Sequence, residues 1–130
     1  MTQNHDARII VIDDEEPIRR LIRRVLESNG YSVFEASDGG AGLKLLAQEA
    51  ADLVITDIFM PGEDGIVTLR RIRKEFPSTK VIVISGGDST GALDMRDQAQ
   101  SLGAVRTLGK PFTATELLRL VEGVLGGALS

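Results

Sequence analysis

Cysteine is absent from this sequence of 130 residues, and the one histidine, His5, lies in a polar stretch at the start of the chain. Without cysteine there is no disulfide framework, no thiolate nucleophile and no cysteine-based zinc site. A single terminal histidine supplies neither a Ser–His–Asp triad nor a multi-histidine metal site. Tryptophan is also absent and aromatic residues make up 4% of the chain, so stacking platforms for nucleic-acid bases are not expected.

The charge and apolar content predict a globular protein that does not bind nucleic acid directly. The formal net charge of −4 disfavours contact with a phosphate backbone. Hydrophobic residues make up 42% of the chain, enough for the core of one domain. No apolar run approaches the about 20 residues of a membrane span, and the first residues, MTQNHDAR, lack the apolar centre of a signal peptide. We therefore expect a cytoplasmic protein without membrane contact.

Short apolar segments alternate with longer amphipathic ones along the chain. Segments rich in valine and isoleucine predict strands, at residues 9–12, 31–36, 53–56, 81–84 and 104–108. Apolar residues at helical spacing predict helices, one from near Pro17 to Asn29-Gly30 and others at residues 40–49, 66–76, 91–102 and 113–125. This alternation indicates an α/β fold, with a parallel sheet covered by helices on both faces. We expect one domain over residues 1–130, with a core at about 7–125 and loose ends at 1–6 and 126–130.

Polar residues follow four of the predicted strands. Asp13 and Asp14 follow the first strand, Asp57 the third and Ser85 the fourth, and Lys110 comes just after the last. The carboxyl ends of parallel strands share one edge of the sheet, where ligands bind in this architecture. Two carboxylates about 4 Å apart repel by roughly 4 kcal/mol at an effective dielectric constant of 20, so one lysine does not balance three acids. We expect Mg²⁺ at this edge, and phosphoryl transfer to Asp57.

Four segments, in this order, resemble the receiver domain of two-component signalling: IIVIDDEEP, LVITDIFMPGEDGI, VIVISGG and GAVRTLGKPF. The resemblance implies a flavodoxin-like, doubly wound sheet of five parallel strands in the order 2-1-3-4-5. It also implies a signalling switch rather than an enzyme, phosphorylated by a sensor histidine kinase or a phosphotransfer protein. We expect a stand-alone receiver, as a monomer or weak dimer, that meets a downstream protein target through the face formed by residues 91–102, 104–108 and 113–125.

The resemblance assigns Asp57 as the phosphoacceptor. Mg²⁺ would be held by Asp13, Asp14 and Asp57 and by the backbone carbonyl of Phe59. Phe59, two residues beyond the acceptor, and Gly87 offer no side chain that orients a hydrolytic water. We therefore expect autodephosphorylation to be slow.

The resemblance also implies how phosphorylation is sensed. Ser85 would bond the aspartyl phosphate, Lys110 would pair with it, and the Lys110-Pro111 peptide bond would be cis. The switch would consist of Ser85 and Thr107, although Thr107 stands where the family usually has tyrosine or phenylalanine. The segment at residues 85–103 is also about one helical turn longer than is typical.

Two enzyme or cofactor-binding functions lack residues that they require in this sequence. A haloacid-dehalogenase-type phosphatase needs an acid two residues after its nucleophile, where Phe59 stands. A flavin or nucleotide binder needs a Gly/Ser/Thr-rich loop after the first strand, where this chain has DDEEP. The alternative that stays open is a pseudo-receiver, a scaffold that binds partners without phosphorylation, because Thr107 departs from the family.

Charged residues outside the predicted site have simpler interpretations. Glu15 suits the start of a helix, where carboxylates are favoured. The arginines of the first helix are expected to lie mostly on a solvated face, which in the family often contacts the kinase; they stand at positions 19, 20, 23 and 24.

Overall fold

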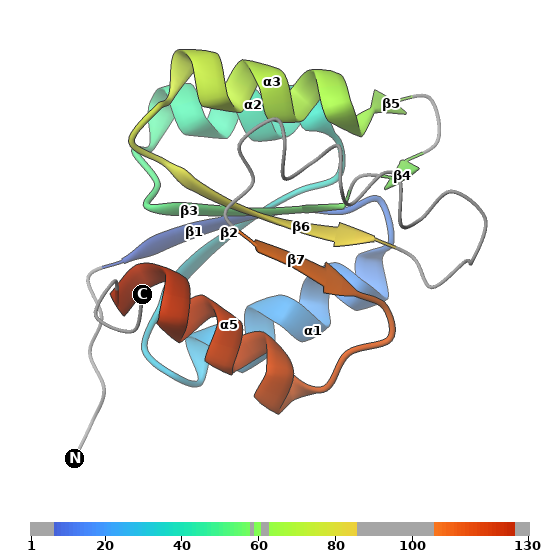
Figure 1. Ribbon diagram of the computed structural model, residues 1–130, viewed down its shortest axis with the longest axis vertical. Helices are drawn as coiled ribbons and strands as arrows, with labels where there is room; N and C mark the ends of the chain where they lie inside the picture. The colour runs from blue at the N-terminus through green and yellow to red at the C-terminus, as the bar shows by residue number, and fades with distance from the viewer. Residues whose placement is uncertain (1–6, 58, 61–62, 86–105, 127–130) are drawn as a thin grey trace.

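The computed structural model describes residues 7–57, 59–60, 63–85 and 106–126, which form a sheet between two layers of helices (Figure 1). The sheet has five parallel strands: β1 (Arg8–Ile12), β2 (Ser32–Ala36), β3 (Leu53–Asp57), β6 (Lys80–Ser85) and β7 (Arg106–Gly109). Their order in space is β2-β1-β3-β6-β7. Counted within this sheet alone, that order is 2-1-3-4-5, so the predicted doubly wound fold is confirmed.

Helices cover both faces of the sheet. On one face lie α1 (Glu16–Glu27) and α5 (Ala114–Gly126), and on the other lie α2 (Gly39–Gln48) and α3 (Gly65–Glu75) (Figure 1). The predicted helix at residues 91–102 and Gly87 lie outside the described residues. A short antiparallel pair, β4 (Phe59–Met60) and β5 (Glu63–Asp64), is missing from the sequence prediction, because strands of two residues leave no periodic signal.

The sequence of β1, RIIVI, accounts for the two-layered core. Successive side chains of a strand point to opposite faces. Ile9 and Val11 therefore pack among residues of α1 and α5, whereas Ile10 and Ile12 pack among residues of α2 and α3. All four are fully buried, which for side chains of this size is worth about 1.5–3 kcal/mol each. This strand, paired on both sides with β2 and β3, holds the next residue, Asp13, at a defined place on the edge of the sheet.

Local signals determine where the helices begin and end. Pro17 lies in the first turn of α1, where its missing N–H costs nothing, and Gly30 ends the turn after that helix with a φ of 95°. Before α5, Thr113 and Glu116 form a capping box: the hydroxyl of Thr113 accepts from the N–H of Glu116 at 3.0 Å, and Glu116 Oε1 accepts from the N–H of Thr113 at 2.8 Å. The chain between β7 and α5 is therefore anchored close to Lys110.

Candidate functional site

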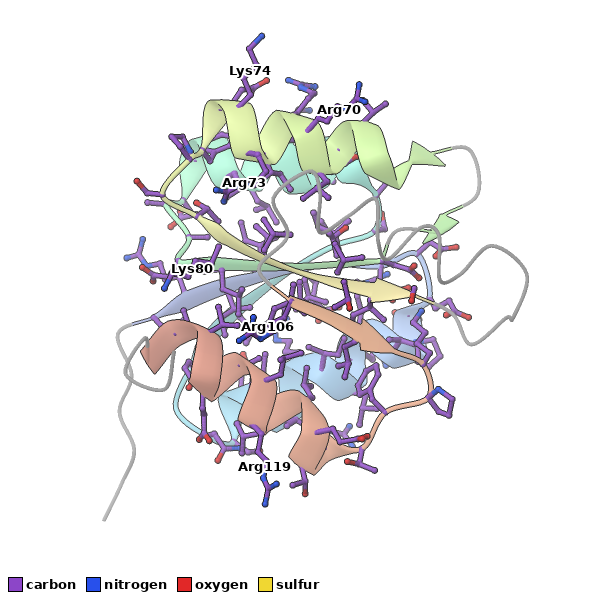
Figure 2. The ribbon with its side chains drawn as sticks, viewed as in Figure 1. Arg70, Arg73, Lys74, Lys80, Arg106 and Arg119 are labelled. Carbon is purple, nitrogen blue, oxygen red and sulfur yellow. The ribbon has the colours of Figure 1, made fainter. Side chains whose placement is uncertain are left out.

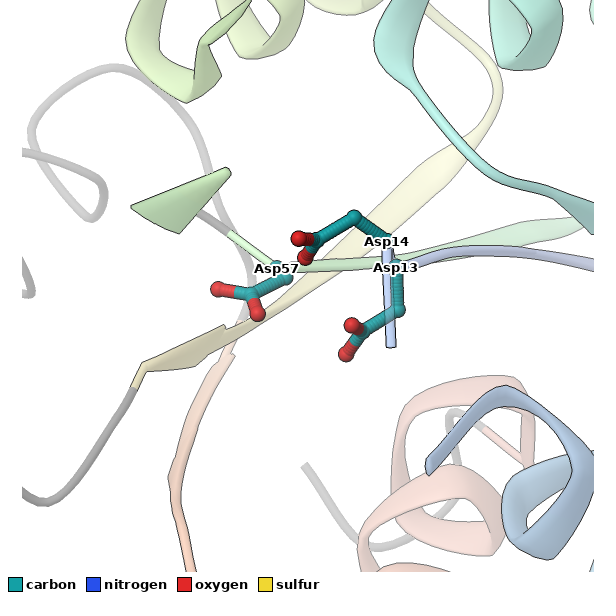
Figure 3. Close-up of side chains that lie close together, drawn as sticks. All are labelled: Asp13, Asp14 and Asp57. Carbon is teal, nitrogen blue, oxygen red and sulfur yellow. The ribbon is translucent and has the colours of Figure 1, made fainter. Parts of the chain in front are cut away.

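Three carboxylates meet at the carboxyl edge of the sheet. Asp13 and Asp14 follow β1, Asp57 ends β3, and each offers an oxygen that lies within 4.8 Å of the others. Figure 3 shows the three side chains converging at the ends of these two strands. The strands are direct neighbours, with Ile12 paired to Thr56, so the residues that come next are brought together. The acids gather as the sequence predicts, while their role as metal ligands stays a prediction.

Lys110 supplies positive charge to this cluster. Its Nζ donates to Asp57 Oδ2 at 2.8 Å, to Glu15 Oε1 at 3.0 Å and to Asp13 Oδ2 at 3.1 Å. Burial opposes the charged form of the amine, but the hydrogen bonds to Asp57 and Glu15 outweigh it and raise the pKa of Lys110 above its ordinary value. The amine is therefore charged at neutral pH. The Lys110-Pro111 peptide bond is cis, as the resemblance implies.

Asp13 is the most deeply buried acid of the cluster, with no exposed surface. Burial raises the pKa of Asp13 and the nearby Asp57 carboxylate adds to the rise, although hydrogen bonds from the N–H of Glu15 and from Lys110 offset part of it. The cluster thus holds four carboxylates, those of Asp13, Asp14, Glu15 and Asp57, and one ammonium group, that of Lys110. A hard dication with oxygen ligands relieves such an imbalance, so the donor set fits Mg²⁺.

Ser85 ends β6, the neighbour of the strand that holds Asp57. Its side chain is fully buried, and its hydroxyl has no hydrogen-bond partner within the described part of the chain. An unsatisfied buried hydroxyl costs about 1–3 kcal/mol and is rare. The backbone around it is fixed, because Asp57 pairs with Ile84 and the N–H of Lys110 donates to the Ser85 carbonyl at 2.8 Å. The hydroxyl thus has a hydrogen-bonding capacity that the described part of the chain leaves unused, and its bond to a phosphoryl oxygen stays a prediction.

The two remaining predicted site residues in the described part of the chain, Thr107 and Phe59, both lie in strands. Thr107 is half-buried in β7, opposite Val83 of β6. Phe59 lies in β4, and the proposed contact of its carbonyl with a metal stays a prediction.

Two charged residues differ from the sequence interpretation. Glu15 does precede α1 as its N-terminal cap residue, but its carboxylate also contacts Lys110, 95 positions away along the chain. The prediction of a solvated side chain is wrong for Arg19, which is only 14% exposed, whereas Arg20 is 68% exposed. Arg19 is shielded from solvent because it pairs with Glu35 of β2. Neither this pair nor the contact of Glu15 with Lys110 has a local signal in the sequence, since each joins elements that lie apart along the chain.

Comparison with known proteins identifies the family. A family model described as the response regulator receiver domain matches residues 9–122. The chain belongs to the response regulator receiver family. The receiver is 34% identical over 120 residues to sporulation initiation phosphotransferase F of Bacillus subtilis, a match that covers 92% of this chain and 94% of that protein. It is 36% identical over 119 residues to response regulator MprA of Mycolicibacterium vanbaalenii, covering 92% of this chain but 50% of that one.

Solved structures show the same fold. A receiver domain protein from Clostridium thermocellum is 36% identical, with a TM-score of 0.84 over 93% of this chain and 95% of that chain. NtrX from Brucella abortus has a TM-score of 0.88 at 33% identity, over 95% of this chain and 28% of that one. The receiver thus spans nearly all of some relatives and half or less of others, and its stand-alone organisation stays a prediction.

Membership of the family establishes the general kind of protein. Receiver domains are signalling proteins of two-component systems and interact with histidine kinases or phosphotransfer proteins. None of the described helices is long and apolar enough to cross a membrane. The predicted cytoplasmic location stays a prediction.

Proposed function

We propose that this receiver is a phosphorylation-activated switch in which Asp57 accepts a phosphoryl group from a phosphohistidine. A carboxylate oxygen of Asp57 forms a bond to phosphorus while the bond from phosphorus to the donor imidazole nitrogen breaks. The main support is the placement of Asp57, 2.8 Å from the amine of Lys110 and within 4.8 Å of two further carboxylates. This cluster has more acids than its lysine can neutralise, which an ion pair serving stability alone does not need.

We propose that the acids hold Mg²⁺ for this transfer. The ligands would be Asp13, Asp14 and Asp57 and the backbone carbonyl of Phe59. When bound, the cation would stabilise the charge that spreads over the phosphoryl oxygens during transfer. Asp57 would thus serve both as ligand and as acceptor, through different carboxylate oxygens.

Lys110 and Ser85 suit the product of the transfer. The ammonium of Lys110, already directed at Asp57, would pair with a phosphoryl oxygen. The Ser85 hydroxyl, which lacks a partner in the described structure, would donate to another oxygen and so gain the bond it lacks. Phosphorylation then favours one arrangement of the ends of β6 and β7 over another.

The output surface that we propose adjoins this change. Thr107 lies opposite Val83 in the ladder between β6 and β7, so movement of Ser85 reaches β7 through its neighbours. The surface would comprise β7, α5 and residues 91–102, the last of which lie outside the described residues. The pseudo-receiver alternative is not favoured, because the acids and the lysine lie together and the buried hydroxyl of Ser85 ends the strand beside that of Asp57.

Labelling with a small phosphodonor tests the proposal. We expect acetyl phosphate to add one phosphoryl group in Mg²⁺ and none in EDTA, as measured by intact mass, and Asp57→Asn to abolish the labelling. Asp52→Asn is a matched control, because Asp52 is an exposed acid directly before the opposite end of the same strand. Labelling of Asp57→Asn at the level of the unsubstituted protein would rule the acceptor out. A pull-down of partners with beryllofluoride-activated protein tests the switch: Asp52→Asn is expected to capture the same partners as the unsubstituted protein, and Asp57→Asn is expected to lose them.

The lifetime of the phosphate is a separate part of this proposal. We propose slow autodephosphorylation, because Phe59 stands where a polar side chain could orient water. Phe59→Asn is expected to accelerate the release of phosphate from the labelled protein. Release within seconds from the unsubstituted protein, or an unchanged rate in the variant, would contradict it.

A further inference from the structure

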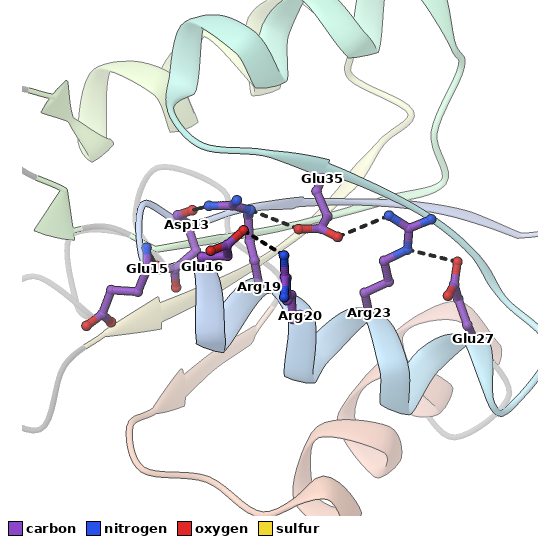
Figure 4. A network of polar contacts seen from close by, with 8 residues as sticks. All are labelled: Asp13, Glu15, Glu16, Arg19, Arg20, Arg23, Glu27 and Glu35. Carbon is purple, nitrogen blue, oxygen red and sulfur yellow. Dashed lines mark hydrogen bonds and ion pairs between the residues drawn. The ribbon is translucent and has the colours of Figure 1, made fainter.

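Arg19 connects the acidic cluster to the far side of β1. Its Nη1 donates to the backbone carbonyl of Asp13 at 2.8 Å, and its Nε donates to Glu35 Oε1 at 2.9 Å. Figure 4 shows these bonds as one chain of contacts that runs from the end of β1 across α1 to β2. The side chains of Arg19 and Glu35 are 14% and 20% exposed, so the pair is shielded from solvent, unlike the exposed pair of Arg20 and Glu16 at 68% and 58%.

These contacts bear on the backbone of Asp13, the first residue after β1. Its N–H donates to the carbonyl of Ala36 at the end of β2, 3.1 Å away. Its carbonyl accepts the bond from Arg19. The peptide groups on both sides of the Asp13 side chain are therefore each held by another element, one by β2 and one by α1. The guanidinium supplies the second of these two restraints.

Glu35 in turn fixes the orientation of Arg19. Glu35 accepts hydrogen bonds from Arg19 at Oε1 and from Arg23 Nη1 at Oε2, 3.0 Å away. Burial alone would raise the pKa of Glu35, but these hydrogen bonds outweigh it and hold the pKa below its ordinary value, so the carboxylate is charged at neutral pH. A planar guanidinium that bonds through both Nε and Nη1 has a defined orientation, which a lysine cannot reproduce.

We propose that Arg19, oriented by Glu35, is a positioning residue that holds the backbone at Asp13 and so sets the geometry of the carboxylates toward Mg²⁺. This inference rests on the proposed metal site at Asp13, Asp14 and Asp57. Groups that orient metal ligands typically change metal affinity by about 10- to 100-fold when removed. Among the described residues, Arg19 bonds to the backbone carbonyl of Asp13 and to Glu35 and not to the carboxylates of the cluster; it acts through the position of Asp13.

Magnesium titration of variants tests the proposal. The dissociation constant for Mg²⁺ is measured by calorimetry, and the stability of each variant is measured by urea unfolding in EDTA. We expect Arg19→Gln to weaken Mg²⁺ binding about tenfold or more and Glu35→Gln to weaken it in the same direction. If the two residues act as a unit, the double variant binds no more weakly than Arg19→Gln alone. Arg20→Gln, on the same helix with an exposed partner, is expected to bind Mg²⁺ normally.

The outcomes separate this inference from the proposed function. Absence of Mg²⁺ binding in the unsubstituted protein would refute the metal site, and this inference with it. Normal Mg²⁺ binding in Arg19→Gln, with only a loss of stability in EDTA, would refute the positioning role alone, because that is the result of a merely structural contact. If Arg19→Gln does not fold, Arg19→Lys takes its place: it keeps the charge but cannot make both bonds, and we expect weaker binding there too.

Discussion

Replacing Lys110 with methionine would remove a charge from the acidic cluster while keeping a side chain of similar length. Two of its partners are shielded, since the side chains of Asp13 and Asp57 are 0% and 5% exposed. At an effective dielectric constant of 20, the 2.8 Å and 3.1 Å contacts correspond to gross attractions of about 6 and 5 kcal/mol. Desolvation cancels much of this, and breaking a buried pair costs about 3–5 kcal/mol net. We expect Lys110→Met to lower the free energy of unfolding in EDTA by that amount.

Mg²⁺ is expected to restore part of the lost stability. A ligand that binds only the folded state adds about 2.7 kcal/mol when its free concentration is 100 times its dissociation constant. Lys110→Met removes the cation that competes with Mg²⁺ for the carboxylates, so the variant is expected to bind the metal more tightly than the unsubstituted protein. The stability gap between the two proteins therefore narrows when Mg²⁺ replaces EDTA.

Urea unfolding followed by far-UV circular dichroism measures both effects, since the chain has no tryptophan to report by fluorescence. Lys74→Met is the matched control, because it makes the same change in charge. Lys74 is an exposed residue of α3 whose side chain points away from the sheet (Figure 2), and it has no carboxylate partner among the described residues. A loss below about 1 kcal/mol for Lys110→Met in EDTA, against the 3–5 kcal/mol of a broken buried pair, would refute the reasoning. An equal loss with and without Mg²⁺ would refute the metal part of it.

Three further predictions concern pH and packing. Because hydrogen bonds from Arg23 and Arg19 outweigh burial and lower the pKa of Glu35 from its ordinary 4.5, the stability it contributes is present above about pH 4.5 and is lost as the pH falls through the lower value in the folded protein. The difference in unfolding free energy between the unsubstituted protein and Glu35→Gln is thus expected to shrink on acidification, and a difference independent of pH would contradict this. Gly42→Ala would place a methyl group against Cδ1 of Ile12 and 2.7 Å from its Cγ1, and we expect a loss of about 1–3 kcal/mol in urea unfolding; an unchanged midpoint would contradict this. Ile22→Ala, at a fully buried position of α1 in the core layer that α1 shares with α5, is expected to cost about 2–5 kcal/mol while labelling of Asp57 by acetyl phosphate continues. Loss of labelling in the folded variant would show that packing in this layer affects the site.

The chain's local pattern is sufficient to predict the sheet and the gathering of three acids and Lys110 at its edge. Strands such as IIVI are apolar at every position because both of their faces are buried, and this pattern is visible without a structure. Asp13, Asp14, Asp57, Ser85 and Lys110 could be singled out because each follows a strand, and parallel strands end at one edge. The strands β4 and β5 could not be predicted from the sequence, since two residues are too few to show the alternation of a strand.

Which charges face one another was decided by the tertiary structure. Glu15 had a sufficient local explanation as a helix-capping residue, and only the fold shows it 3.0 Å from Lys110. Arg19 belongs to a basic stretch that looks solvated in sequence, yet β2 brings Glu35 to it and buries the pair. Hydrophobic periodicity is a property of neighbours along the chain, so sequence reveals it. The burial and pairing of a charge depend on residues from other elements, so they are determined only when those elements pack.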